Sequence, residues 1–377
     1  RGSITKFEQY RSCPFAYFSR YGLGLEERPR YQFAAPDLGM LVHGALRIIG
    51  ERLLRGQKQW YAIPDADVPA ICRQATDELA PQVQHDILMS NAYFAQIKER
   101  LIQTLTRTVR RLSAFSAVSD FHMEGLEKSF GRPGSPWEAL RFTLKNGLQV
   151  VVTGQIDRID TLRQGDHKYV VIIDYKSGRK QLDISQIFTG LELQLLTYMF
   201  VALLNIGGDA IPAAVLYCYV RNDKVSLEYR VSEEDKKKLY DAKGKLTGFY
   251  LDDGQVMQQL DTSMQGFSDF LNLRLKKDGT LSDSSHTLYN EAGWSHLLDW
   301  AARQIRDIAG HIGDGDISIH PILMGQQAPC SYCPYRPVCR FDVAVAGNTY
   351  DAAGREDTDE MIQKMFDEGD DEHGLDE

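Results

Sequence analysis

Two apolar runs separated by a short polar stretch lie near the middle of the chain. They cover residues 154–160 and 169–176, and both contain many of the β-branched residues that favour strands. The polar stretch between them, residues 163–166, contains the glycine that a tight turn favours. We therefore predict a β-hairpin. Since residues 170–173 are all apolar, we expect its second strand to be central and buried on both faces.

Apolar positions before the hairpin recur with helical spacing. The pattern predicts a helix over residues 3–20, broken or kinked at Pro14, and another over residues 37–54. Two further helices are expected between residues 66 and 118. The helical part of the chain thus extends over about 36–118.

Strand-like and helical patterns alternate after residue 120. Strands are predicted at residues 123–130, 140–144, 148–157 and 213–220, and a strand-like segment at 317–322. Helices are predicted at residues 184–204, 233–245 and 290–312, the second within a polar, irregular region, 222–290. Strands followed by a helix and another strand indicate an α/β core at about 121–220, with C-terminal helices and a cysteine-rich segment at 290–342.

The composition is that of a globular protein, with 43% hydrophobic and 25% charged residues among 377. No apolar run reaches the roughly 18 residues that a membrane span requires, so we expect no membrane association and a cytoplasmic location. The chain starts at Arg1 rather than Met, and we expect it to be a fragment of a longer protein.

Charge is unevenly distributed along the chain. Residues 356–377 contain eleven acids and, among Lys and Arg, only Lys364, so this segment carries −10. By difference from the net charge of −9, the remainder carries +1 and is compatible with a nucleic-acid partner. We expect one domain over residues 1–345 and an acidic, disordered tail over 346–377. The tail would aid solubility or contact a basic partner surface.

Charged residues follow the buried core of the predicted hairpin. Asp157 lies near the end of the first strand and Asp174 near the end of the second, and Lys176 shares a strand face with Asp174. Two carboxylates beside an amine are suited to Mg²⁺-dependent phosphodiester hydrolysis. The alternative is a set of solvated strand-end residues. Glu127, on an earlier strand, faces either this site or solvent.

Three other polar residues have weaker individual signals. His43 lies among apolar neighbours in a helix, where a single histidine is more often buried and hydrogen-bonded than a ligand. Gln194 and Tyr198 are four residues apart and share a helical face. The alternative for both is a position at the edge of a core helix.

Cys330, Cys333 and Cys339 supply three thiols within ten residues. A close cysteine cluster in a cytosolic chain indicates metal binding rather than disulfides. Cys13 is the best candidate for a fourth ligand, and a metal held by all four would join the two ends of the domain. Zinc and an iron–sulfur cluster both remain open on this chemistry. Cys72 and Cys218, in apolar contexts, are expected in the core.

Six short motifs occur in one order along the chain. They are Ser12-Cys13-Pro14-Phe15, Gly39-Met40-Leu41-Val42-His43, Gly154-Gln155-Ile156-Asp157-Arg158-Ile159-Asp160, Ile173-Asp174-Tyr175-Lys176-Ser177-Gly178, Gln194-Leu195-Leu196-Thr197-Tyr198 and the C-terminal cysteines. In this combination the chain resembles the RecB-like branch of the PD-(D/E)xK nuclease superfamily, and within it the AddB-type iron–sulfur nuclease domains. The resemblance implies a restriction-endonuclease-like α/β fold: a mixed central sheet flanked by helices, a helical insertion and an iron–sulfur staple.

The resemblance also implies roles for individual residues. His43, Asp157, Asp174 and the backbone carbonyl of Tyr175 would bind Mg²⁺, and Lys176 would be the catalytic lysine. Gln194 and Tyr198 would support the site or touch DNA. A 4Fe–4S cluster with a structural role would be held by Cys13, Cys330, Cys333 and Cys339.

The function implied is that of a Mg²⁺-dependent deoxyribonuclease domain in an AddAB-type helicase–nuclease. Such a domain cleaves one unwound DNA strand while double-strand breaks are processed for homologous recombination, together with an AddA-type helicase subunit. Two alternatives stay open. One is a DNA-binding scaffold of the same fold whose nuclease site is unused, and the other is a free-standing RecB-like nuclease of the CRISPR-associated kind.

Overall fold

The computed structural model of the chain describes residues 1–28, 31–178, 182–220, 232, 244–282, 286–354 and 356–370, with side chains described to residue 367. The predicted helix at 233–245 falls almost entirely outside these residues. No helix in the described part is long and apolar enough to cross a membrane.

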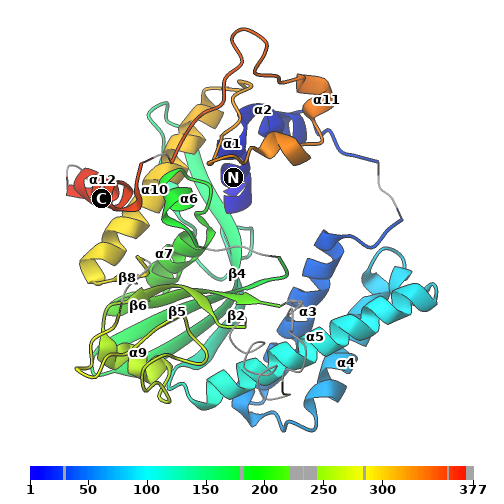
Figure 1. Cartoon of the computed structure of the whole chain (residues 1–377), viewed down its shortest axis with the longest axis vertical. Coiled ribbons are helices and arrows are strands. Elements are labelled where there is room, and N and C mark those ends of the chain that lie inside the picture. The colour runs from blue at the N-terminus through cyan, green and yellow to red at the C-terminus, as the bar shows by residue number, and fades with distance from the viewer. Residues whose placement is uncertain are drawn as a thin grey trace.

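A mixed sheet of eight strands forms the centre of the molecule (Figure 1), as the predicted fold class requires. Its strands are β1 (Gly2–Ser3), β2 (His122–Phe130), β3 (Arg141–Thr143), β4 (Gln149–Gln164), β5 (His167–Lys176), β6 (Ala210–Tyr219), β7 (Thr247–Leu251) and β8 (Leu288–Tyr289). The main order is β1-β4-β5-β6-β7-β8, and β2 and β3 also pair with β4. The pairs β1–β4, β5–β6 and β7–β8 are parallel, and the other pairs are antiparallel.

The predicted hairpin is confirmed as β4 and β5. Their antiparallel pairing runs from Gln164 opposite His167 to Arg158 opposite Ile173. Residues 170–173 are fully buried because helices cover the sheet and β6 continues it. Asp157 differs from the expectation: β4 continues for seven residues beyond it, and it lies instead where pairing with β5 stops.

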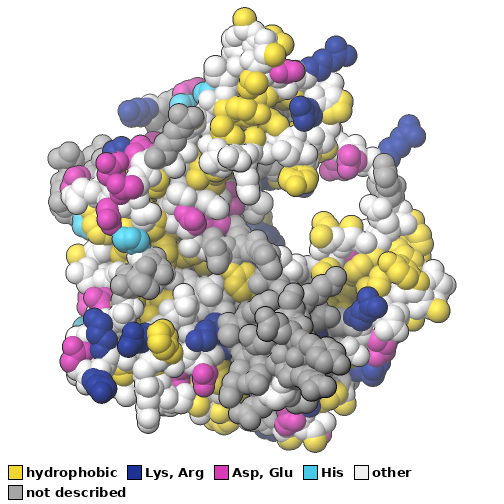
Figure 2. All heavy atoms as spheres, viewed as in Figure 1, with side chains coloured by type: hydrophobic (Ala, Val, Ile, Leu, Met, Phe, Trp, Pro, Cys, Tyr) yellow, Lys and Arg dark blue, Asp and Glu magenta, His cyan; other side chains and the backbone are white. Residues whose placement is uncertain are grey.

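Helices surround the sheet in two groups (Figure 1). The first group follows the predicted helical part: α3 (Ala35–Arg55), α4 (Val68–Leu79) and α5 (Ala92–Ala117). The second group includes α1 (Ile4–Ser12), α2 (Pro14–Tyr17), α6 (Ile184–Phe188), α7 (Gln194–Ile206), α10 (Glu291–Gly313) and α11 (Arg336–Cys339). An open gap separates the α3–α5 group from the part that carries α1, α2 and α11 (Figure 2). The sheet therefore provides the main connection between the two groups.

Pro14 breaks the first helix as predicted, since α1 ends at Ser12 and α2 begins at Pro14. The single helix predicted at 184–204 is wrong, because α6 and α7 are separated by a junction, residues 189–193. Gly190 in this junction has a left-handed backbone, with φ of 78°. A side chain there would also press on Gln304, so the break depends on glycine.

The prediction that residues 222–290 are irregular is corrected for the described part of that region. Strands β7 and β8 extend the sheet there, and α9 (Gly254–Leu260) precedes a buried turn. The strand-like pattern at 317–322 forms no regular strand and makes only an isolated bridge between Ile322 and Asp351.

The acidic C-terminal segment also differs from expectation. Helix α12 (Thr358–Asp370) packs against α6 and α10 and buries Met361 and Met365. These methionines are four residues apart and form one apolar stripe, which the acidic composition of the segment obscures. The expected disorder is therefore wrong for residues 358–370, and residues 371–377 lie outside the described part.

Candidate active site

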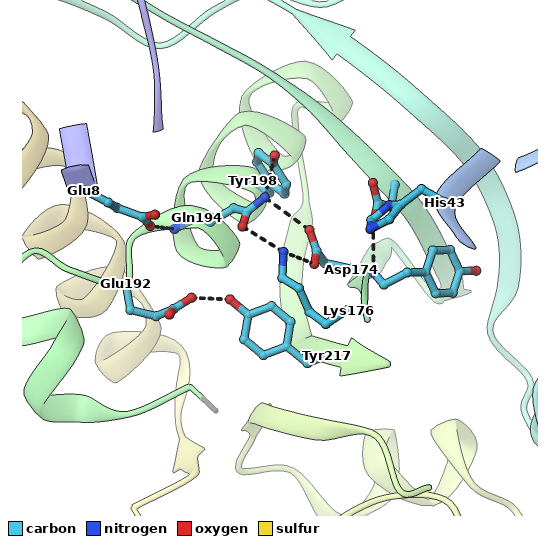
Figure 3. Close-up of polar contacts among 10 residues, drawn as sticks. Glu8, His43, Asp174, Lys176, Glu192, Gln194, Tyr198 and Tyr217 are labelled. Carbon is cyan, nitrogen blue, oxygen red and sulfur yellow. Dashed lines mark hydrogen bonds and ion pairs between the residues drawn. The ribbon is translucent and has the colours of Figure 1, made fainter. Parts of the chain in front are cut away.

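Lys176 and Asp174 meet at the exit of β5, on the face that the strand alternation predicts. The Lys176 Nζ lies 2.6 Å from the Asp174 Oδ2. It also donates a hydrogen bond of 3.0 Å to the Gln194 Oε1 and lies 5.3 Å from the centre of the Tyr217 ring. Three neighbours from β5, α7 and β6 thus fix the position of the amine (Figure 3).

Gln194 and Tyr198 complete this network from the first turns of α7. The Gln194 Nε2 donates to the Asp174 Oδ1 at 3.3 Å and to the Tyr198 hydroxyl at 2.9 Å. The i,i+4 spacing puts both side chains on the face of α7 that lies over β5. The structure therefore brings them to the predicted site, where they support the carboxylate and the amine.

His43 projects from α3 toward the other predicted acid. Its Nδ1 lies 3.0 Å from the Asp157 Oδ2, which also accepts a 2.9 Å hydrogen bond from the backbone N–H of Tyr175. Asp157 thereby joins three elements, α3, β4 and β5. The register of the β4–β5 ladder, continued by one pair, sets Asp157 opposite Asp174.

The electrostatics of the site reflect two buried acids on adjacent strands. Burial and the charge of Asp157 raise the pKa of Asp174 to about 6, and the Lys176 ammonium opposes this shift. Burial would lower the pKa of His43, but its hydrogen bond to Asp157 and the charges of Asp157 and Asp174 raise it. Such carboxylates favour a bound cation, which would offset their repulsion.

Glu127 is a third acid whose position the sequence left open. It sits between two β2 residues that pair with Arg158 and Ile156, and therefore opposite Asp157. Its φ of 48° is unusual for a non-glycine residue, and its carboxylate accepts a hydrogen bond from the Gln155 side chain. Burial and Asp157 raise the pKa of Glu127 to about 7. Strand pairing was needed to find this neighbour.

Arg158 and Asp160, in the same motif as Asp157, form a buried structural pair on the opposite face of β4. The guanidinium makes two hydrogen bonds of 2.7 and 2.6 Å to the carboxylate and lies over the Trp60 ring. Both residues are only 2% exposed. The pair links the helical part to the strand that carries Asp157.

A divalent metal fits the chemistry of these donors, although no three His, Cys, Asp or Glu side chains in the described residues form a ready-made metal cage. The Asp174 Oδ2 is buried and makes no hydrogen bond of good geometry, despite its ion-pair contact with Lys176. A buried carboxylate oxygen left in this way is an available ligand for a hard cation. His43 and Asp157 lie on adjoining elements.

The four cysteines predicted as cluster ligands gather between the N-terminal and C-terminal segments. Cys13 is buried at the start of α2, and the other three, on or beside α11, are half-buried. Burial raises the pKa of Cys330, and Cys13 and the other two thiols add to this effect. Hydrogen bonds from Phe15 to Ser318 and from Ile322 to Ser12 hold the two segments together. The donor set suits a soft metal or an iron–sulfur cluster.

The family model for the PD-(D/E)XK nuclease superfamily matches residues 1–340. The chain belongs to the PD-(D/E)XK nuclease superfamily. The fold and the clustering of Asp157, Asp174 and Lys176 agree with this membership. The motif-based resemblance is thus confirmed at the level of the superfamily.

Relatives of this nuclease chain carry a more specific name, that of ATP-dependent helicase/deoxyribonuclease subunits of the B type. The Moorella thermoacetica protein of this name is 37% identical, over 94% of this chain and 31% of the relative. The Bacillus subtilis protein is 34% identical over 93% of the chain and 30% of its own length, and the Bacillus pumilus protein 32% over 98% and 32%. The chain spans about a third of the length of these curated relatives. It is therefore similar to one region of them.

Proposed function

We propose that this chain is the nuclease domain of a B-type helicase–nuclease subunit and that it hydrolyses DNA phosphodiesters with a divalent metal ion. The observation that carries the proposal is the convergence of His43, Asp157, Asp174 and Lys176 at one end of the hairpin. Membership of the nuclease superfamily and the names of the similar proteins support it.

His43, Asp157, Asp174 and the Tyr175 carbonyl would hold Mg²⁺. When bound, Mg²⁺ would supply positive charge to the scissile phosphate and lower the pKa of a coordinated water. Tyr175 follows Asp174 directly and its N–H is bonded to Asp157, so its peptide unit is held beside both acids.

Lys176 would donate a hydrogen bond to the attacking water or to a phosphate oxygen on which negative charge develops. Its amine is suited to this because Asp174, Gln194 and Tyr217 fix its position before substrate binds. Gln194 would hold both the amine and the Asp174 carboxylate, and Tyr198 would orient the Gln194 amide. These contacts limit the reorganisation needed during the reaction.

The wider role proposed is cleavage of one unwound DNA strand during the processing of double-strand breaks for homologous recombination. Its basis is the printed function of the similar proteins, which are ATP-dependent helicase/deoxyribonuclease subunits. A partner helicase subunit of the AddA type and a cytoplasmic location follow from the same role.

We also propose that Cys13, Cys330, Cys333 and Cys339 hold a 4Fe–4S cluster that joins the ends of the domain. The mutual influence of the thiols on their pKa values supports their proximity. Iron content and a thiolate-to-iron absorbance band test this assignment, whereas one zinc per chain without iron would replace it with a zinc site.

The decisive experiment measures cleavage of single-stranded DNA with and without Mg²⁺, using the protein assembled with its partner subunit. Lys176→Ala is expected to reduce the rate by about 10²–10³-fold, because it removes a positioned charge from the transition state. Lys168→Ala is the matched control: this lysine lies on the same strand but pairs with Glu124, away from the site. It should cut like the parent.

Cutting by Lys176→Ala at the parental rate would refute the active-site assignment. Tight DNA binding without Mg²⁺-dependent cutting by the parent would instead favour the scaffold alternative. Full activity in the absence of the partner subunit would favour a free-standing nuclease.

A further inference from the structure

Helix α1 contacts the junction between α6 and α7, whose last residue precedes Gln194. The Glu8 carboxylate accepts hydrogen bonds from the backbone N–H groups of Leu193 at 2.8 Å and Gln194 at 3.2 Å. These N–H groups lie at the start of α7, and Leu193, at the N-cap position, provides no side-chain cap. Glu8 therefore caps α7 from a helix 185 residues earlier in the chain (Figure 3).

A second residue of α1 holds the other end of the junction. The Arg11 Nε donates a 2.7 Å hydrogen bond to the Thr189 carbonyl, while its Nη1 pairs with Asp351 at 2.6 Å. Glu8 and Arg11 are three residues apart and share one face of α1. The junction is thus held at both ends by the helix that leads to Cys13.

The junction in turn carries two of the contacts that fix Lys176. Gln194 accepts the hydrogen bond from the Lys176 amine. Tyr217, whose ring lies 5.3 Å from that amine, is hydrogen-bonded through its hydroxyl to the buried Glu192. The charge of Glu8 also contributes to the raised pKa of Tyr198 and of Tyr217, which places the carboxylate close to the site.

We propose that Glu8 is a positioning residue of the nuclease, which sets Gln194 and through it Lys176 from the cysteine-bearing N-terminal segment. The inference rests on the proposed nuclease function. It assigns no contact with DNA or metal to Glu8. Its consequence is that a change in the segment around Cys13 reaches the catalytic amine through one carboxylate and two backbone N–H groups.

The test is a double-mutant cycle in the full protein with its partner subunit, measured as Mg²⁺-dependent cleavage of single-stranded DNA. Glu8→Ala should lower kcat by about 10–100-fold and leave KM for DNA within about twofold, since misplaced catalytic groups affect the reaction more than binding. In a Gln194→Ala background the same substitution should have little further effect, because Glu8 acts through Gln194. Glu27→Ala, an exposed acid in the same N-terminal segment, is the control.

Equal losses from Glu8→Ala in both backgrounds would overturn the inference, because a general loss of stability adds independently. Should Glu8→Ala fail to fold, Glu8→Gln replaces it, since the amide oxygen can still accept from both N–H groups. A severalfold loss that disappears with Gln194→Ala would support the proposal, and parental activity would overturn it.

Amide hydrogen exchange gives a readout that does not depend on catalysis. The Leu193 and Gln194 amides should exchange faster in Glu8→Ala, and unchanged exchange would overturn the capping role. Absence of Mg²⁺-dependent cutting by the parent would refute the proposed function instead. The two failures are therefore distinguishable.

Discussion

Asp174 is 1% exposed, and its pKa is raised from 3.8 to about 6 by burial and by Asp157. The folded state binds this proton more tightly than the unfolded state does, so the stability of the metal-free protein falls as pH rises from about 4 to about 6. At neutral pH the ionised carboxylate costs stability, which a bound cation would restore. Function and stability therefore conflict at this residue.

Asp174→Asn is expected to raise the thermal midpoint of the metal-free protein at pH 7 by a few degrees, about 2–4 °C per kcal/mol gained. The amide fills the same space without a buried negative charge. The variant should not cleave DNA. Asp166→Asn, in the exposed hairpin turn, should change neither property, and a lower midpoint for Asp174→Asn would contradict the argument.

The Mg²⁺ requirement should depend on pH. Burial and neighbouring acids raise the pKa of Glu127 to about 7 and that of Asp174 to about 6, so protons compete with a cation below neutrality. The concentration for half-maximal cleavage should rise as pH falls from about 8 to about 6. Glu127→Gln should weaken this dependence around neutrality, and a pH-independent requirement in the parent would refute it.

Residues differ in how well the sequence assigns them. Asp174 and Lys176 were predictable because strand alternation alone puts them on one face. His43 was assigned only by resemblance, because a single histidine on an apolar helix has no distinctive pattern. Glu8 was missed because its partners are backbone N–H groups far along the chain. Its role requires the tertiary structure.

At the scale of elements, strong periodicity predicted the helices of residues 35–117 and the hairpin. The break between α6 and α7 was missed because the apolar pattern continues across it. The determinants of the break are Gly190 and contacts from α1, which no local pattern records. Helix α12 was missed for a different reason, since its acids suggested a solvated tail.

Met365→Ala tests the docking of α12. Met365 is fully buried, so truncation should destabilise the contact with α10 and α6 by about 2–3 kcal/mol. Amide exchange in α12 should accelerate accordingly. Gln363→Ala, on the exposed face of the same helix, is the control. Unchanged protection in Met365→Ala would mean that the helix does not depend on this packing.

At the scale of the whole molecule, the cysteines join segments that are distant in sequence. Cys13→Ala should abolish the iron absorbance band and lower the thermal midpoint, because a loop of more than 300 residues loses its closure. Cys72→Ala, at a buried cysteine outside the group, should keep the band. Retention of full iron by Cys13→Ala would show that another ligand completes the site.

The dependence of α7 on α1 and α10 also bears on synthesis at the ribosome. Helix α1 emerges before the hairpin, but it packs against α10, which is translated almost 300 residues later. Pairings of such wide separation form late in folding. A nascent polypeptide that has released its hairpin but not α10 therefore lacks the support of its catalytic amine. Translation order thus delays cutting competence until α10 has left the ribosome.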